Sequence, residues 1–132
     1  MINRKLLDDE DGEDLARALK YNERIEKISL ENNLLGPRFL VALADTLRHN
    51  KYIKYIDLEG NSLTGGNNEE GIKALFEALK ENDTLVSLNL NNTSLTSRSG
   101  LDIKRGMQNN KKIIMLDIEK NPDLELDDVR DI

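Results

Sequence analysis

The chain has 132 residues, of which 38% are hydrophobic, 4% aromatic and 33% charged, a composition that suits one domain with a thin core. Its 25 acidic residues outnumber its 19 basic ones, and the net charge of −6 argues against a dedicated nucleic-acid or anionic-membrane binder, because both need a basic surface. Without cysteine there is no disulfide or thiol catalysis, and without an apolar run long enough for a membrane span or signal peptide we expect a soluble, cytoplasmic protein.

Helical and extended patterns alternate along the chain. Helical spacing comes first, with Leu15, Ala18 and Leu19 on one face, and the extended segment IEKISLENNLL follows. Before the extended segment IKYIDLEGNSL, a helical stripe consists of Leu40, Leu43, Ala44 and Leu47. After that segment, a second stripe consists of Ile72, Leu75, Phe76 and Leu79. After LVSLNLNNTSL comes a weaker helical stripe of Leu101, Ile103 and Met107, interrupted by Lys104, Arg105 and Gly106. The last extended segment is IIMLDIEKNPDL.

The four extended segments share one template of apolar positions that ends near an asparagine. They begin at Ile25, Ile53, Leu85 and Ile113, so successive starts differ by 28, 32 and 28 residues. A period of 28 residues with one insertion of four accounts for all three spacings, and the insertion lies in TGGNNEEG at 64–71. Leu15, Leu19 and Asn22 also precede Leu43, Leu47 and Asn50 by 28 residues, so the first helix follows the same register.

This pattern resembles the leucine-rich repeat family, in particular its ribonuclease-inhibitor-like subtype. The resemblance implies an α/β fold: a right-handed horseshoe segment of a leucine-rich repeat solenoid, with a parallel sheet on the concave face and helices on the convex face. We expect one leucine-rich repeat domain over 1–132, with a partial repeat at 1–24 and about four repeats starting near 25, 53, 85 and 113. A fifth helix would begin near Asp127 to Val129, so we expect a fragment of a longer array.

The template separates buried strand positions from a turn-forming asparagine. Its inward residues are predicted to be Ile28, Leu30, Ile56, Leu58, Leu88, Leu90, Leu116 and Ile118. Asn33, Asn61 and Asn121 occupy the asparagine position, where the side chain can bond backbone groups of the turn and join neighbouring coils. Thr93 replaces the asparagine in the third segment, so we expect a looser coil there, with Asn92 as a substitute.

The residues that alternate with the buried ones are the candidate binding site, because the concave face usually carries function in this fold. They form three predicted columns: Lys27, Tyr55, Ser87 and Met115; Ser29, Asp57, Asn89 and Asp117; and Glu31, Glu59, Asn91 and Glu119. The last two columns contain five acidic residues and no basic one, which predicts a protein partner with a basic or mixed surface. Tyr55 and Met115 would be anchors. The alternative is that the acidity only keeps an open sheet soluble.

Other sites have weaker signals. We expect no catalytic residue, cofactor, metal or small-molecule substrate, since His49 is the only histidine and its place at a helix end is explained by the helix dipole. The glycine-rich insertion lacks the lysine of a phosphate-binding loop. It is either a second contact site or a tolerated insertion.

Two classes of function follow from the resemblance. The first is a non-enzymatic protein–protein interaction module or scaffold, as in the tropomodulins that cap actin filaments, the repeat arrays of immune receptors or ciliary axoneme subunits. We favour a cytoskeletal or ciliary scaffold. The alternative is a GTPase-activating regulator resembling the Ran GTPase-activating protein, for which Arg98 would be the rim arginine.

Overall fold

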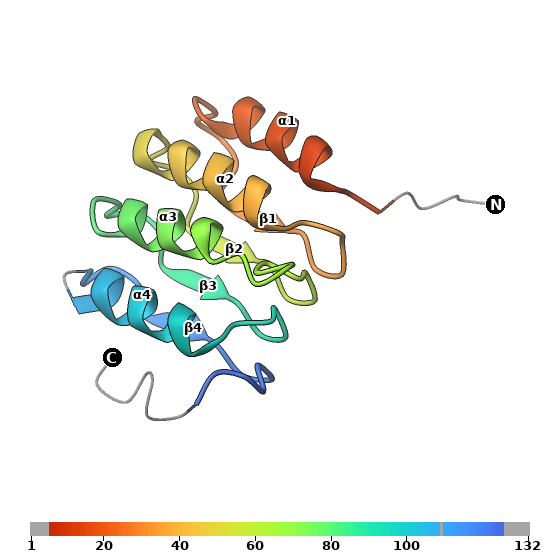
Figure 1. Cartoon of the computed structure of the whole chain (residues 1–132). Coiled ribbons are helices and arrows are strands. Elements are labelled where there is room, and N and C mark those ends of the chain that lie inside the picture. Colours follow the sequence, from red (N-terminus) through yellow and green to blue (C-terminus); the bar gives the residue numbers. More distant parts are fainter. Residues whose placement is uncertain (1–5, 109, 126–132) are drawn as a thin grey trace.

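The computed structural model describes residues 6–108 and 110–125, in which helices and strands alternate (Figure 1). The elements are α1 (Asp9–Leu19), β1 (Lys27–Ser29), α2 (Pro37–His49), β2 (Tyr55–Asp57), α3 (Glu70–Leu79), β3 (Ser87–Asn89), α4 (Ser97–Gln108) and β4 (Met115–Asp117). The predicted fifth helix near 127–129 lies outside the described residues. No helix in the described ranges has the length and apolarity required to cross a membrane.

The strands form one parallel sheet in the order β1-β2-β3-β4, and the helices lie side by side over one of its faces (Figure 1). The predicted strand register is confirmed: Lys27 lies opposite Tyr55, Tyr55 opposite Ser87, and Ser87 opposite Met115. Sequential order keeps every connection short, because each helix only has to return the chain to the adjacent strand.

The core lies between the sheet and the helices. The inward strand residues of β1 to β3 are buried as predicted, with at most 8% of each exposed, and Leu116 and Ile118 of the last unit are partly buried. The stripes of α2 and α3 are also confirmed, since Leu40, Leu47, Ile72 and Leu79 are each 0% exposed.

The predicted stripes of α1 and α4 need correction. In α1 the buried alanine is Ala16 while Ala18 is exposed, because the inward face is centred on Gly12, Ala16 and Leu19. In α4 Ile103 is buried and Met107 packs against the core as predicted, but Leu101 is 56% exposed, and Ser99, Gly100 and Gly106 belong to the buried face. Gly106, which the sequence pattern presents as an interruption, belongs to the contact between α4 and α3, because its backbone lies against Phe76.

Replacing Gly106 with alanine is expected to lower the free energy of unfolding by about 1 to 3 kcal/mol. A Cβ at this position would lie 2.8 Å from both the Cβ and the carbonyl oxygen of Phe76, so α4 would have to move away from α3. The higher helix propensity of alanine offsets only about 1 kcal/mol of that cost. Urea denaturation would measure the change. Gly65→Ala is the control, because the nearest atom to its Cβ would be the Ser62 carbonyl oxygen at 3.4 Å, and a loss equal to that of Gly106→Ala would contradict the close-contact explanation.

The asparagines of the strand exits join neighbouring units as predicted. Asn61 Nδ2 donates to the carbonyls of Leu30 and Leu58, each at 2.9 Å, and Asn61 Oδ1 accepts from Leu35 N at 3.1 Å. At the threonine position the expectation about Asn92 is wrong. Asn92 is exposed with φ 52°, and the backbone carbonyl of Thr93 instead accepts from Leu63 N at 3.2 Å. Backbone therefore replaces the side-chain link at this turn.

Candidate functional site

The first candidate site is the open sheet face, which is the face opposite the helices. All twelve predicted residues remain accessible: Lys27, Ser29, Glu31, Tyr55, Met115 and Glu119 are exposed, and Asp57, Glu59, Ser87, Asn89, Asn91 and Asp117 are half-buried. Their alternation with buried neighbours follows the two-residue period of a strand. The structure thus brings these side chains together as three parallel columns.

A hollow of about 370 Å³ lies in the open sheet face. Its accessible lining consists of Lys27, Tyr55, Asp57, Ser87, Asn89 and Asp117. Tyr55 is 45% exposed, and Met115, which lies beyond Ser87 in the same column, is 56% exposed. Large exposed apolar surfaces beside a polar depression are typical of protein contact sites.

Several polar side chains of this face also order the turns that leave the strands. Asp57 Oδ1 accepts from Glu59 N at 3.0 Å, and Asn89 Oδ1 accepts from Asn91 N at 2.8 Å. Asn89 Nδ2 lies 3.4 Å from Glu59 Oε1, and Asn91 Oδ1 accepts from Glu119 N at 2.7 Å. The structural role accounts for some of the polar residues in these columns.

The acidic residues of this face are not neutralised by ion pairs. Among the described residues, no ion pair involves Glu31, Asp57, Glu59, Asp117 or Glu119. Lys27 is the one basic residue among the twelve, against these five carboxylates. No group of three or more metal-ligating side chains that could hold an ion occurs in the described ranges.

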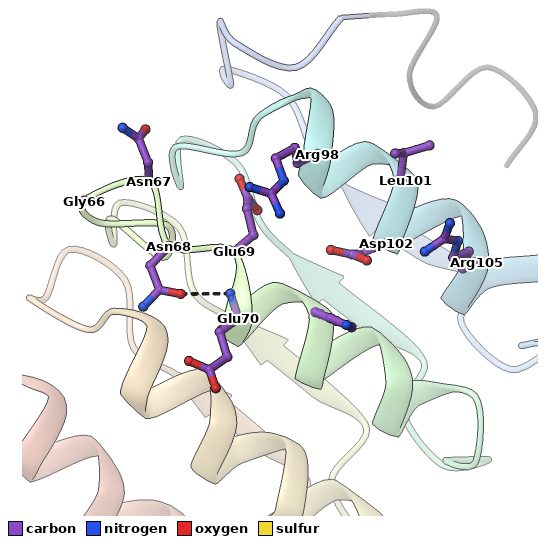
Figure 2. Close-up of a pocket in the computed structure, with 10 residues that line it drawn as sticks. Gly66, Asn67, Asn68, Glu69, Glu70, Arg98, Leu101, Asp102 and Arg105 are labelled. Atoms are coloured by element: carbon purple, nitrogen blue, oxygen red, sulfur yellow. Dashed lines mark hydrogen bonds between the residues drawn. The ribbon is translucent and has the colours of Figure 1, made fainter.

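The second candidate site is a groove of about 630 Å³ between α3, α4 and the insertion, which we call the α3–α4 groove (Figure 2). It is lined by Gly66, Asn67, Asn68, Glu69, Glu70, Lys73, Arg98, Leu101, Asp102 and Arg105. The sequence indicated the insertion and Arg98 as candidate contacts, but it did not indicate that the other charged residues line the same groove. The seven-residue spacing of Arg98 and Arg105 places both on one face of a helix and was the signal for Arg105.

Glu69 forms the floor of the α3–α4 groove. It is 9% exposed, and its carboxylate accepts hydrogen bonds from the hydroxyls of Ser99, at 2.7 Å, and Thr96. The same two hydroxyls cap α4, since Thr96 N donates to Ser99 Oγ at 3.0 Å. Asp9, the first residue of α1, has the equivalent role. Its Oδ1 accepts from Gly36 N at 2.8 Å and from Phe39 N at 3.0 Å, both at the start of α2. In both places an acidic side chain at one helix start holds the start of the next helix.

Asp102 faces α3 from the first half of α4 (Figure 2). Burial raises the pKa of its carboxyl, and the charge of Glu69 raises it further, while Arg105 and Lys73 oppose the shift. The carboxylate therefore lies close to both cations without forming an ion pair with either of them.

The repeated strand–helix units, the sequential parallel sheet and the asparagine turns define a leucine-rich repeat protein. The profile of the TMOD/LMOD leucine-rich domain matches residues 2–120, and the chain belongs to this family. It is 30% identical over 103 residues to leiomodin-2 of Mus musculus and 30% identical over 105 residues to leiomodin-3 of Homo sapiens. These matches cover 76% and 78% of this chain, but the chain spans only 18% of either relative.

Solved structures agree with this assignment. The structure titled "Leiomodin-1 Actin-Binding Site 2 (ABS2)" has a TM-score of 0.76 and 26% sequence identity, over 84% of this chain and 63% of that one. The tropomodulin C-terminal domain of Caenorhabditis elegans has a TM-score of 0.67 at 14% identity, over 92% of this chain and 72% of that one, and it supports the fold alone.

Proposed function

We propose that this chain is a non-enzymatic, protein-binding module of the actin cytoskeleton. The observation that carries the proposal is the similarity, at a TM-score of 0.76 over 84% of the chain, to a leiomodin-1 domain whose title describes an actin-binding site. The names of the relatives favour a cytoplasmic, cytoskeletal setting over a ciliary one.

The open sheet face is the proposed contact with the partner, and it would be the concave face of a short solenoid. Three features support this assignment: five carboxylates that form no ion pair within the described ranges, the exposed Tyr55 and Met115, and the hollow between the columns. A basic or mixed partner surface would complement such a face, because opposite charges steer association and fix the orientation of docking.

The repeats are proposed to be of the ribonuclease-inhibitor-like subtype, within one domain that is part of a longer array. The alternation of helices of ten to thirteen residues with three-residue strands supports the subtype. The much greater length of the curated relatives supports the longer array.

The purified chain is expected to co-sediment with filamentous actin, and the double variant Tyr55→Ala, Glu59→Lys is expected to remain mostly in the supernatant. This variant removes an exposed aromatic anchor and reverses one charge, and it disturbs only the long Asn89 contact at 3.4 Å. We expect the dissociation constant to rise at least about tenfold, which is the effect of losing one anchor residue of an interface. An unchanged far-ultraviolet circular dichroism spectrum would verify the fold.

The matched control is Tyr21→Ala, Glu23→Lys, which makes the same changes at exposed residues beyond the end of α1. It should bind like the wild type. Wild-type affinity of the Tyr55 and Glu59 variant would remove the open sheet face from the interface. A wild-type chain that binds neither monomeric nor filamentous actin would reject the actin proposal itself.

A further inference from the structure

The α3–α4 groove lies on the helix side of the molecule, and none of its lining residues belongs to a strand. With about 630 Å³ it is larger than the hollow of the open sheet face, at about 370 Å³. A contact made here would therefore be separate from the one proposed above.

One wall of the α3–α4 groove is the insertion, and hydrogen bonds hold this wall in place. The Thr64 hydroxyl donates to the Ser94 carbonyl of the next unit, and the Thr64 carbonyl accepts from Asn68 N at 3.2 Å. Asn68 Oδ1 in turn accepts from Glu70 N at 2.9 Å at the start of α3 (Figure 2). The wall thus exists before any ligand binds, which lowers the entropy cost of binding.

The cations of the α3–α4 groove differ in their contacts from the arginines of α1 and α2. The arginines of α1 and α2, namely Arg17, Arg38 and Arg48, each form an ion pair. Arg98 and Arg105 of α4 and Lys73 of α3 form none with the described residues. Their guanidinium and ammonium groups can therefore still pair with a ligand, in a groove that also contains the carboxylates of Glu69, Glu70 and Asp102.

The arrangement of these residues specifies the ligand. Arg98 and Arg105 are two helical turns apart, which corresponds to about 10 Å along α4. Leu101 lies between them and is 56% exposed. An arginine binds a carboxylate through two parallel hydrogen bonds, so the pair matches two acidic side chains separated by an apolar one. Each oxygen of the Glu69 carboxylate accepts from one hydroxyl, which fixes its orientation toward the start of α4.

We propose that the α3–α4 groove docks an acidic segment of a partner protein, with carboxylates on Arg98 and Arg105 and an apolar side chain on Leu101. This inference goes beyond the proposed function, which uses the opposite face. Asp102 opposes such a ligand electrostatically, so it limits affinity and favours segments whose carboxylates avoid it.

The test is a titration of the ¹⁵N-labelled chain followed by NMR. The probe is a helical peptide with two glutamates seven residues apart and a leucine between them, and the comparison peptide has lysines in place of the glutamates. We expect the glutamate peptide to shift amide signals of the insertion and of α4, to leave those of β1 to β4 unchanged, and to bind more weakly at high salt. The lysine peptide should cause no such shifts.

Variants separate a specific groove from general charge attraction. The double variant Arg98→Glu, Arg105→Glu should lower the affinity for the glutamate peptide at least about tenfold, since two charge-assisted contacts are lost. Asp102→Asn should raise this affinity a few-fold. Arg24→Glu, at an exposed arginine outside the groove, should leave the affinity unchanged. Binding that survives the double reversal, or shifts that appear with inorganic phosphate but not with the peptide, would overturn the proposal. Actin co-sedimentation of the same variants would remain at wild-type level, so the two proposals can fail independently.

Discussion

Leu88→Asp is expected to unfold the chain under conditions in which the wild type is folded. Leu88 is 0% exposed and is the inward residue of β3, paired in register with Ile56 on one side and Leu116 on the other. A carboxylate buried among apolar side chains without a partner costs several kcal/mol, while a domain is stable by only about 5 to 15 kcal/mol. Loss of the helical circular dichroism signal and of a cooperative thermal transition would be the measured result.

The control for this change is Ser87→Asp, which introduces the same side chain one residue earlier. Ser87 is half-buried on the open sheet face, so its carboxylate would remain in water. This variant should melt within a few degrees of the wild type. Equal destabilisation by both variants would mean that charge in the sheet, rather than burial at position 88, causes the loss.

The strand register could be predicted from the sequence because two independent periods fix it. Alternation within each strand decides which residues are inward, and the 28-residue spacing aligns Ile28, Ile56 and Leu88 even though the insertion intervenes. A shift by one residue would place every inward leucine on the open face, and the 28-residue repeat excludes shifts by two. The twelve accessible residues followed directly from the same two periods.

The helical faces and the α3–α4 groove could not be predicted with the same success. Gly106 and Gly12 have no apolar side chain to mark them, and their burial depends on how closely the next helix approaches. Glu69 reads as a solvent-exposed acid until the hydroxyls of Thr96 and Ser99, 27 and 30 residues later, are placed beside it. The burial of these residues therefore depends on contacts between successive units, which the pattern within one unit does not predict.

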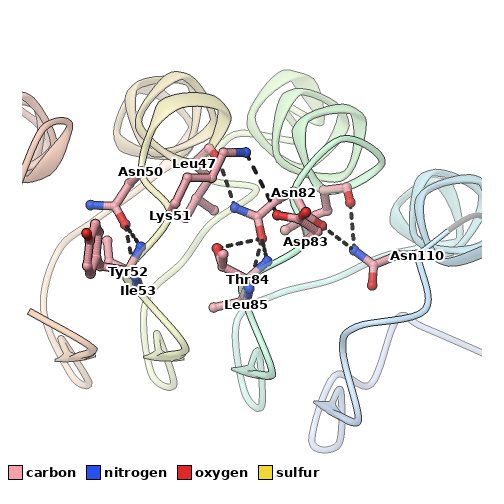
Figure 3. Close-up of polar contacts among 11 residues, drawn as sticks. Leu47, Asn50, Lys51, Tyr52, Ile53, Asn82, Asp83, Thr84, Leu85 and Asn110 are labelled. Carbon is pink, nitrogen blue, oxygen red and sulfur yellow. Dashed lines mark hydrogen bonds and ion pairs between the residues drawn. The ribbon is translucent and has the colours of Figure 1, made fainter. Parts of the chain in front are cut away.

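A second set of asparagines makes such contacts where the helices end (Figure 3). Asn82 is 3% exposed; its Oδ1 accepts from Thr84 N at 3.0 Å and Leu85 N at 2.8 Å, and its Nδ2 donates to the Leu47 carbonyl at 2.8 Å. Asn50 and Asn110 repeat this arrangement, with Nδ2 donating to the carbonyls of Leu19 and Leu79 respectively. One side chain thus closes its own turn and holds the end of the preceding helix.

Asn82→Ala is expected to lower the free energy of unfolding by about 3 to 5 kcal/mol, because it leaves three backbone groups unpaired at a site from which water is largely excluded. Urea denaturation would measure the loss, and hydrogen exchange should show it in the last turn of α2 as well as in the turn before β3. The matched control is Asp83→Ala, since Asp83 is exposed and its carboxylate lies 4.0 Å from Lys51 Nζ, a surface pair worth less than about 1 kcal/mol. If Asn82→Ala destabilises only the turn before β3 and leaves exchange in α2 unchanged, the asparagine closes its own turn without joining the two units. Units this thin, with few aromatic residues, bury too little apolar surface to be coupled by packing alone. If both segments lose protection together, the helix-exit asparagines therefore join neighbouring units into one cooperative structure.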